Sequence, residues 1–269
     1  MSLSRSGIDY LTHVWNPVAG CNNNCSWCYG RNRWAPRMKH LCKLCGDYVP
    51  HIHTERFGDV TPGQKPKVIG LGFFTDLFGP HQWQGRFDSW DLPFQRAEVV
   101  LQHVKSHVWG CPQHQFVTLT KFPENIPRGS AWPDNWHIGV SCTTQPEVEE
   151  RVPALIDSGV PHPILSLEPL LARVDVGVDI AFDFFDSEFA HAPAVTQLEW
   201  IIAGGLTGCG KSPTQIEWVE DIAIACEEAG VPLYVKRNAP QPSDDGSTQS
   251  WLPWPREAPE PIAAILRQH

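Results

Sequence analysis

Three cysteines have a spacing suited to an iron–sulfur cluster. Cys21, Cys25 and Cys28 form a C-x3-C-x2-C run directly after an expected strand, in a loop of small and polar residues. Three thiolates can bind three irons of a cubane and leave the fourth iron open to chelate a small molecule. Zinc usually takes four ligands in pairs such as C-x2-C, and no fourth ligand follows this triplet at regular spacing. The run therefore favours a catalytic [4Fe-4S] cluster over a zinc site or thiols that merely lie close together.

A second group of metal-binding residue types follows shortly afterwards. Cys42 and Cys45 form a C-x2-C pair, and His51 and His53 come next. Together they could furnish a tetrahedral Cys2His2 zinc site. A second iron–sulfur cluster, or cysteines without any metal, are the alternatives. We favour zinc because this stretch lacks the hydrophobic residues that would hold it together, and a metal would supply folding energy.

Charged side chains stand where expected strands end. Lys121, Glu168 and Lys236 end three of these strands, and Asp76 follows another. Barrel enzymes place their chemistry at the carboxyl ends of parallel strands, so a mixture of charges there could grip a polar or anionic substrate. Surface salt bridges are the alternative for the first three. The Asp76 carboxylate could hold an ammonium group, or it could cap a turn or helix.

The elements that must position these residues are strands alternating with helices, which predicts a parallel α/β sheet with crossover helices. Mostly apolar runs predict seven strands, at residues 13–17, 67–75, 115–120, 137–142, 163–167, 200–203 and 232–236. Helical spacing predicts helices over 92–107 and 147–158, and a third that starts at Ser212-Pro213 with a Thr214-x-x-Glu217 box, buries Cys226 and stops at Gly230. Residues 30–64 break this alternation and are interpreted as an inserted excursion. The Pro-rich tail, 238–269, is expected to wrap over the surface of the main domain, 1–237.

Composition narrows the class of protein. The 269 residues, 42% of them hydrophobic, can bury a sizeable core, and 30 acidic against 21 basic residues give a net charge of −9. This balance argues against attraction of the whole chain to nucleic acid or to an anionic membrane. No apolar run has the length of a membrane span, and the opening residues do not resemble a secretory signal. We therefore expect a cytoplasmic protein whose nine cysteines serve metals or catalysis rather than disulfides.

The cysteine run resembles that of the radical S-adenosylmethionine (radical SAM) superfamily, in which C-x3-C-x2-C follows the first barrel strand. Further motifs, between about Trp15 and Lys236, are similar to those of a little-characterised radical-SAM-like family of phages and bacteria. They are Trp15-Asn16-Pro17, Gly20-Cys21, Thr75-Asp76-Leu77-Phe78, Leu119-Thr120-Lys121-x-Pro123, Gly139-Val140-Ser141, Ser166-x-Glu168-Pro169-Leu170-Leu171, Gly204-Gly205 and Gly230-Val231-Pro232-x-x-x-Lys236. Leu206 departs from the Glu that usually follows the paired glycines.

The resemblance implies a partial (β/α) barrel of six to seven strands and a cluster whose open iron holds S-adenosylmethionine. One electron, from a reductant such as flavodoxin or ferredoxin, would then yield a 5′-deoxyadenosyl radical that abstracts hydrogen from substrate. The resemblance also implies which residues lie near S-adenosylmethionine: Trp27, Asp76, Ser141, Gly204 and Gly205. Trp27 could pack on adenine or shield the cluster. Lys121, Cys142, Glu168 and Lys236 become candidate catalytic residues; Cys142 could donate hydrogen to a product radical, although a strand-end cysteine is more often a small buried hydrophobe.

The association with phages suggests that the substrate is a nucleobase. It would be a base of DNA that undergoes hypermodification, or part of a modified nucleotide. A basic-aromatic surface could receive DNA; the alternative is a solvated helix. This surface would comprise Arg31, Arg33, Trp34, Arg37 and Lys39.

Two other classes of function stay open. Gly205-x4-Gly210-Lys211-Ser212 formally matches a phosphate loop after a strand, which would suit a nucleotide hydrolase, but Pro213 follows and no partner strand supplies the magnesium-binding Asp. A metal-bound nucleic-acid adaptor without catalysis is the third class.

Overall fold

The computed structural model describes residues 3–85, 94–184, 187–207, 213–240 and 255–269. All seven expected strands are present and lie parallel to their neighbours in chain order. They are β2 (His13–Trp15), β5 (Val68–Leu71), β8 (Gln115–Thr120), β9 (Trp136–Cys142), β10 (Pro163–Leu167), β13 (Trp200–Ala203) and β14 (Leu233–Val235). The short β1 (Ser4–Arg5) pairs antiparallel with β2 and completes an eight-stranded sheet.

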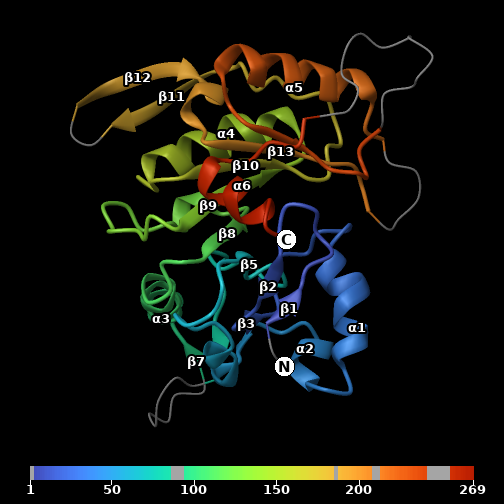
Figure 1. The fold of residues 1–269 in the computed structure, drawn as a ribbon, viewed down its shortest axis with the longest axis vertical. Coiled ribbons are helices and arrows are strands. Elements are labelled where there is room, and N and C mark those ends of the chain that lie inside the picture. Colours follow the sequence, from blue (N-terminus) through green and yellow to red (C-terminus); the bar gives the residue numbers. More distant parts are fainter. Residues whose placement is uncertain (1–2, 86–93, 185–186, 208–212, 241–254) are drawn as a thin grey trace.

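The expected α/β class is thus confirmed as a large, mostly parallel sheet. Figure 1 shows its strands following one another from β2 in the lower half to β13 in the upper half. Pairs such as Val140 with Leu165, and Leu165 with Ile201, set a common register across the middle of the sheet. Among the described residues no pairing joins β1 to β14, so the sheet is open.

One face of the sheet packs against three helices: α3 (Ala97–Trp109), α4 (Gln145–Asp157) and α5 (Ile216–Ala229). Successive side chains of a strand point to opposite faces, so alternate residues such as Ile138, Val140 and Leu165 join this core. The first two helices overlap their expected spans. Gly230, at φ 67°, ends α5 in the left-handed conformation as expected.

The expected start of α5 is wrong. The helix begins at Ile216, with Gln215 rather than Thr214 at its N-cap. The Thr214 hydroxyl instead donates to the carbonyl of Leu170, 2.8 Å away, and so joins this segment to the chain after β10. Ser212 lies outside the described residues, as do residues 208–211 of the phosphate-loop-like run.

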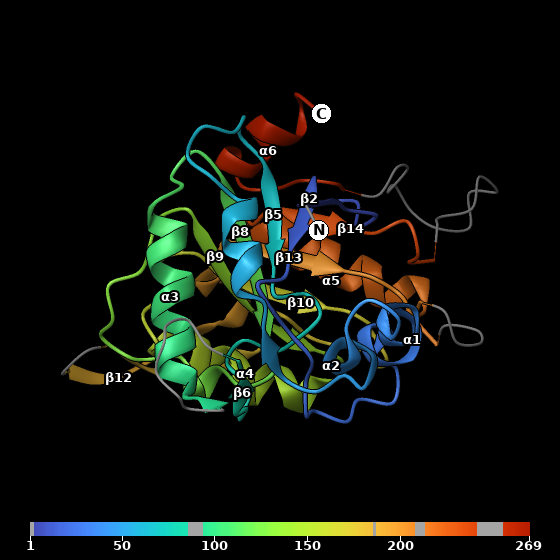
Figure 2. The ribbon, with the colours of Figure 1, turned by 90° about the horizontal axis from the view of Figure 1, so that it is seen from below.

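The opposite face of the sheet is divided into two halves. Near the amino ends of the strands, Val117, Ile164 and Trp200 form a second core with Tyr10 and Ile262. Ile262 belongs to α6 (Glu260–Leu266), a helix that the sequence analysis did not predict. Figure 2 shows α6 at the top of the molecule, next to β5. Near the carboxyl ends of the strands, this face is polar.

The expected excursion is a compact layer of short elements. It contains a π-helical turn (Gly30–Trp34), α1 (Ala35–Met38), α2 (Lys43–Gly46), β4 (His51–Ile52) and a 3-10 helix (Thr54–Asp59). A second sheet has the order β3 (Val18–Ala19), β4, β6 (Trp83–Gln84) and β7 (Phe94–Gln95). This sheet ties the excursion to the chain on either side of it.

Smaller elements complete the fold. The hairpin of β11 (Asp179–Phe184) and β12 (Ser187–Pro193) projects at the upper left of Figure 1. Two 3-10 turns span Pro123–Asn125 and Ala194–Gln197. None of the helices within the described ranges is both long and apolar enough to cross a membrane.

Candidate functional site

A cavity of about 880 Å³ opens at the carboxyl ends of the parallel strands. Its walls come from the N-terminal segment, the cysteine loop and the polar half of the sheet. It gathers ten of the residues predicted from the sequence: Cys21, Cys25, Trp27, Cys28, Asp76, Lys121, Ser141, Glu168, Gly205 and Lys236. The fold thus brings residues from seven separate segments to one site.

The cysteine loop is held by backbone N–H groups that point at sulfur. The N–H of Asn23 donates to Cys21 Sγ and the N–H of Arg31 to Cys28 Sγ, each at 3.3 Å. The Arg31 guanidinium donates to the carbonyl oxygens of Cys21, at 2.8 Å, and Asn23. Such donors stabilise negative charge on sulfur and are typical of thiolates that bind metal.

The spacing of the three sulfurs distinguishes between kinds of metal centre. Some groups of three or more metal-binding side chains have ligand atoms that all lie within 4.8 Å of one another. Among the described residues, Cys21, Cys25 and Cys28 are not such a group. A single zinc ion with bonds of about 2.3 Å would need its sulfurs about 3.8 Å apart. A cubane separates them further because each thiolate binds a different iron.

Burial favours the protonated thiols of Cys21 and Cys25 when no cation is beside them. It raises the pKa of Cys21 to about 12, against a smaller lowering by the N–H of Asn23. Burial also raises the pKa of Cys25, and the charge of Lys121 opposes this. Because thiolates and not thiols bind metals, a cationic centre would have to displace these protons.

Asp76 is less free to hold an ammonium group than expected. Its carboxylate is buried and accepts hydrogen bonds from the Thr120 hydroxyl at 2.6 Å and from the Lys121 N–H at 2.9 Å. The N–H of Phe78 adds a third contact at 3.3 Å. Burial raises the pKa of Asp76, and these donors oppose the rise. Asp76 lines the cavity, but it also joins the ends of β5 and β8 and caps the following turn.

Glu168 and Lys236 form an ion pair across the mouth of the sheet. Lys236 Nζ lies 2.6 Å from Glu168 Oε2, and both side chains are less than one-fifth exposed. Gly204 makes room for this pair, since a Cβ there would lie 3.1 Å from Lys236 Cδ and 3.4 Å from Glu168 Cγ. Among the two predicted glycines, Gly205 lines the cavity.

Several buried polar atoms of the cavity wall have no hydrogen-bond partner among the residues that the structure describes. They are Ser166 Oγ, Glu168 Oε1 and Asn238 Oδ1, all buried. Buried polar groups are nearly always hydrogen-bonded, and these three belong to residues that line the cavity. They are therefore suited to meet polar groups of a ligand.

Sequence reasoning gave no role to Ser166 or Asn238. Ser166 stands two residues before Glu168, so strand alternation puts both side chains on one face, and this signal could have identified it. Tyr48 was also missed: its hydroxyl lies 3.6 Å from Cys28 Sγ, and Arg31 stacks over its ring at 5.1 Å. No sequence pattern links Tyr48 to a cysteine twenty residues earlier.

The prediction that Cys142 faces the substrate is wrong. Ser141 lines the cavity, so its neighbour Cys142 points to the opposite face, where it is buried and its thiol donates to the carbonyl of Glu147. Burial raises the pKa of Cys142 to about 12. The alternative of a small buried hydrophobe is the one observed.

Two members of the expected basic-aromatic surface are engaged inside the protein. Arg31 binds the cysteine loop, as described above. Trp34 stacks on Phe74 with ring centroids 4.2 Å apart. These contacts support the cysteine loop, while Arg33, Arg37 and Lys39 of the same stretch are exposed.

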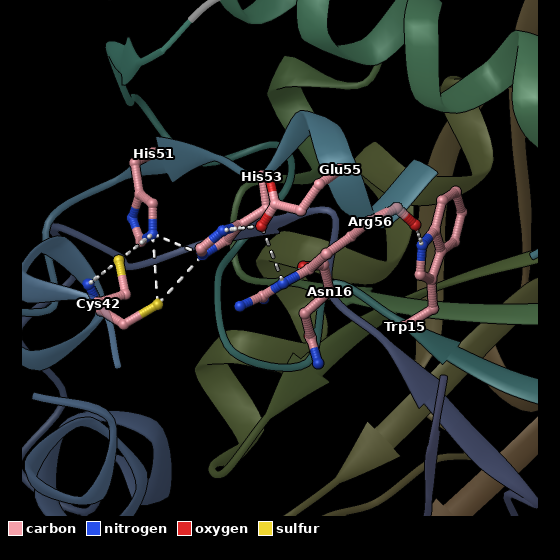
Figure 3. Close-up of polar contacts among 8 residues, drawn as sticks. Trp15, Asn16, Cys42, His51, His53, Glu55 and Arg56 are labelled. Carbon is pink, nitrogen blue, oxygen red and sulfur yellow. Dashed lines mark hydrogen bonds and ion pairs between the residues drawn. The ribbon is translucent and has the colours of Figure 1, made fainter. Parts of the chain in front are cut away.

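The second expected metal site comes together in one place. Cys42, Cys45, His51 and His53 have ligand atoms all within 4.8 Å of one another, and all but Cys42 are buried (Figure 3). Burial lowers the pKa of both histidines, to about 4 for His53, and raises that of Cys45 to about 12. Neutral imidazoles and two thiols in this geometry could hold a metal ion such as zinc.

A third cluster lies at the amino ends of the strands, away from the cavity. Glu199 Oε2 lies 3.0 Å from Nδ1 of both His137 and His162. His137 Nε2 is 2.8 Å from Gln115 Oε1. Burial raises the pKa of Glu199, but the two histidines outweigh it and bring that pKa down to about 2. We interpret this cluster as structural, because its members satisfy one another.

Comparisons with known proteins place the chain in a family without assigning an activity. The sequence model of the family described as "Protein of unknown function (DUF5131)" matches residues 5–244, so the chain belongs to that family. No curated protein and no solved structure matches the chain.

Proposed function

We propose that this member of the DUF5131 family holds a [4Fe-4S] cluster on Cys21, Cys25 and Cys28 and acts as a radical SAM enzyme, its open sheet serving as a partial (β/α) barrel. One observation carries the proposal: three thiols of a single loop and the polar ends of the parallel strands line one cavity. The N–H groups that point at sulfur add support. When bound, a reduced cluster would supply the electron that cleaves S-adenosylmethionine and so starts radical chemistry.

The chain's own residues would hold and orient the ligands. The three cysteines leave one iron of a cubane without a protein ligand, where a chelating ligand could bind. Ser166, Glu168 and Asn238 offer unpartnered polar atoms on the opposite wall, and Lys236 adds a positive charge beside them. Half-buried Trp27 lies in the cavity wall, where it can limit the access of water.

The test is anaerobic reconstitution followed by product analysis. Protein loaded with iron and sulfide, reduced with dithionite and given S-adenosylmethionine, is expected to release 5′-deoxyadenosine. Cys28→Ala should lose most of its iron and this product. Cys142→Ala is the matched control, because it removes a thiol from the far face of the same sheet and should retain both.

The opposite result is equally clear. Fully reconstituted protein that releases no 5′-deoxyadenosine would contradict the proposal. So would equal iron content in Cys28→Ala and Cys142→Ala, since iron would then be bound elsewhere.

A further inference from the structure

We infer that Cys42, Cys45, His51 and His53 hold one structural zinc ion, and that this ion shapes the neighbouring loop on which Cys21, Cys25 and Cys28 stand. The second half of this inference rests on the proposed function, because it concerns the loading of that loop with iron. The first half is independent of it.

The ligand distances fit a tetrahedral ion. Zinc–sulfur bonds of about 2.3 Å and zinc–nitrogen bonds of about 2.0 Å place sulfur and nitrogen about 3.5 Å apart at the tetrahedral angle. Cys45 Sγ lies 3.3 Å from His51 Nε2 and 3.2 Å from His53 Nε2, and Cys42 Sγ lies 3.6 Å from His51 Nε2. The two Nε2 atoms, 2.8 Å apart, would need to separate by only about 0.5 Å.

Neighbouring acceptors orient both imidazole rings toward the centre. His51 Nδ1 lies 2.7 Å from the carbonyl of Val49. His53 Nδ1 lies 2.9 Å from Glu55 Oε1, a contact drawn in Figure 3. A proton on each Nδ1 leaves Nε2 with a lone pair that points at the sulfurs. Metal-binding histidines in proteins commonly have such a partner on the other nitrogen.

The four ligands make a closed, structural centre. All four positions of a tetrahedron are filled by protein side chains, whereas a catalytic zinc keeps one position open. The core next to the ligands is small: its buried members among the described residues are Cys45, Ala19 and Met38, while Ile52 and Val60 of the excursion pack in the large core. A zinc ion would therefore supply much of the free energy that orders this segment.

The segment between the ligands holds the cysteine loop directly. Cys21 N–H donates to the carbonyl of Tyr48, and the Tyr48 hydroxyl lies 3.6 Å from Cys28 Sγ. Both cysteines that bound the loop thus contact one residue, which stands between Cys45 and His51.

The strand before the loop is fixed in the same way. Val18 and Ala19 pair with Ile52 and His51 as an antiparallel ribbon. The N–H of His53 donates to the carbonyl of Pro17 at 2.7 Å. Two zinc ligands therefore set the position of the chain that leads into Cys21.

The contacts continue to the end of β2. Glu55, next to His53, lies 3.9 Å from Arg56 Nε. Arg56 donates to the carbonyl of Asn16 at 2.9 Å and accepts from Trp15 Nε1 at 2.8 Å (Figure 3). A disordered zinc centre would therefore loosen the loop at both ends, and iron would be lost with the zinc.

The experiment measures zinc and iron separately in the full-length chain. Wild-type protein reconstituted with iron and sulfide is expected to contain about one zinc and about four irons per chain. Cys28→Ala should lose iron and keep zinc. His53→Ala should lose zinc and, although it removes no cluster ligand, retain about tenfold less iron.

Two variants control for a general effect of the substitution. His40→Ala removes an exposed histidine of the same excursion and should change neither metal. His53→Cys replaces the ligand with a thiolate and should restore both. Far-UV circular dichroism of each variant checks that the large sheet remains folded.

A second measurement works without any iron. In zinc-loaded, iron-free protein, alkylation of Cys21 and Cys28 by iodoacetamide should be about tenfold slower than in His53→Ala, because the ordered loop buries these thiols. Equal alkylation rates, or full iron loading of a folded, zinc-free His53→Ala, would overturn the inference. Wild-type protein that shows the zinc-dependent protection but releases no 5′-deoxyadenosine would instead refute only the proposed function.

Discussion

Two buried hydroxyl groups, those of Ser166 and Thr120, differ in their hydrogen bonding. Ser166 is 1% exposed and lines the same cavity as Glu168 and Lys236, yet its hydroxyl oxygen has no hydrogen-bond partner in the described part of the chain. The Thr120 hydroxyl, equally buried, donates to Asp76 at 2.6 Å. The first hydroxyl is available to a ligand, and the second is used by the fold.

Substitution by alanine should separate the two roles. Ser166→Ala is expected to change the free energy of unfolding by less than about 0.5 kcal/mol, because no hydrogen bond is lost, while weakening the binding of S-adenosylmethionine or substrate. Thr120→Ala should cost about 1–3 kcal/mol, because it leaves a buried carboxylate short of a donor. Urea denaturation and isothermal titration measure the two effects. A loss of stability in Ser166→Ala matching that in Thr120→Ala would contradict the assignment.

The chemistry at this scale could be predicted only where residue types are distinctive. Two cysteine groups and the charged strand ends were found from spacing, and the structure gathers each group together. Ser166 was given no role of its own, although strand alternation places it on the same face as Glu168. Cys142 was placed on the wrong side because its role depended on one step of strand alternation.

At the scale of elements, the cysteine loop depends on one turn. Gly20 has φ 85°, and a Cβ there would lie 2.1 Å from the carbonyl oxygen of Val49. Its N–H donates to Phe74, and its carbonyl accepts from the Thr75 hydroxyl at 2.5 Å. The turn therefore brings the cysteine loop against both the excursion and the chain after β5.

Gly20→Ala is expected to destabilise the protein by at least about 2 kcal/mol, since strain at positive φ adds to a backbone clash. Iron retention should fall with it. Gly63→Ala is the matched control, because nothing lies within 4 Å of a Cβ at that position and its backbone has no positive φ. Thermal denaturation compares the two variants, and similar melting temperatures would show that the turn tolerates a side chain.

Elements with a long apolar pattern could be predicted, and short ones could not. Three of the seven strands, β8, β10 and β13, have the expected bounds. Strands in the interior of a parallel sheet form mostly apolar runs, which can be recognised in the sequence. Strands β3 and β4, with two residues each, are too short to show any period. Helix α6 was missed because it follows Pro259 in a segment dominated by prolines.

The whole molecule has two ends with different tasks. The carboxyl ends of the strands line the cavity, and the amino ends carry the cluster of His137, His162 and Glu199. The hydrogen bond to Glu199 raises the pKa of His162, whereas burial lowers that of His137. His162 is therefore the histidine that takes up the proton.

This cluster makes stability depend on pH in a defined direction. A histidine whose pKa is higher in the folded than in the unfolded protein stabilises the fold fully at pH values below its unfolded pKa of about 6.5. This stabilisation is lost as the pH rises through the folded pKa. Wild-type protein should therefore exceed His162→Gln by about 0.5–1 kcal/mol near pH 5.5, with the difference shrinking by pH 8.5. The stabilisation from the Glu199 carboxylate is lost only as the pH falls from its unfolded pKa of about 4.3 to its folded pKa of about 2. Both values lie below the range from pH 5.5 to 8.5. Urea unfolding of both proteins at pH 5.5 and pH 8.5 tests this prediction. His40→Gln, at an exposed position, serves as the control. A stability difference between wild type and His162→Gln that grows with pH would refute the prediction.

The second core joins distant parts of the chain. Tyr10 and Leu11 are packed in one cluster with Ile262 and Ile265, against the inward side chains of five strands. On the ribosome, this cluster cannot close until residue 265 has left the exit tunnel. The thiols of Cys21, Cys25 and Cys28 have been synthesised long before that, so they face the metals and oxidants of the cell while one side of their future cavity is still open. Closure of the second core thus follows the synthesis of the cysteine loop.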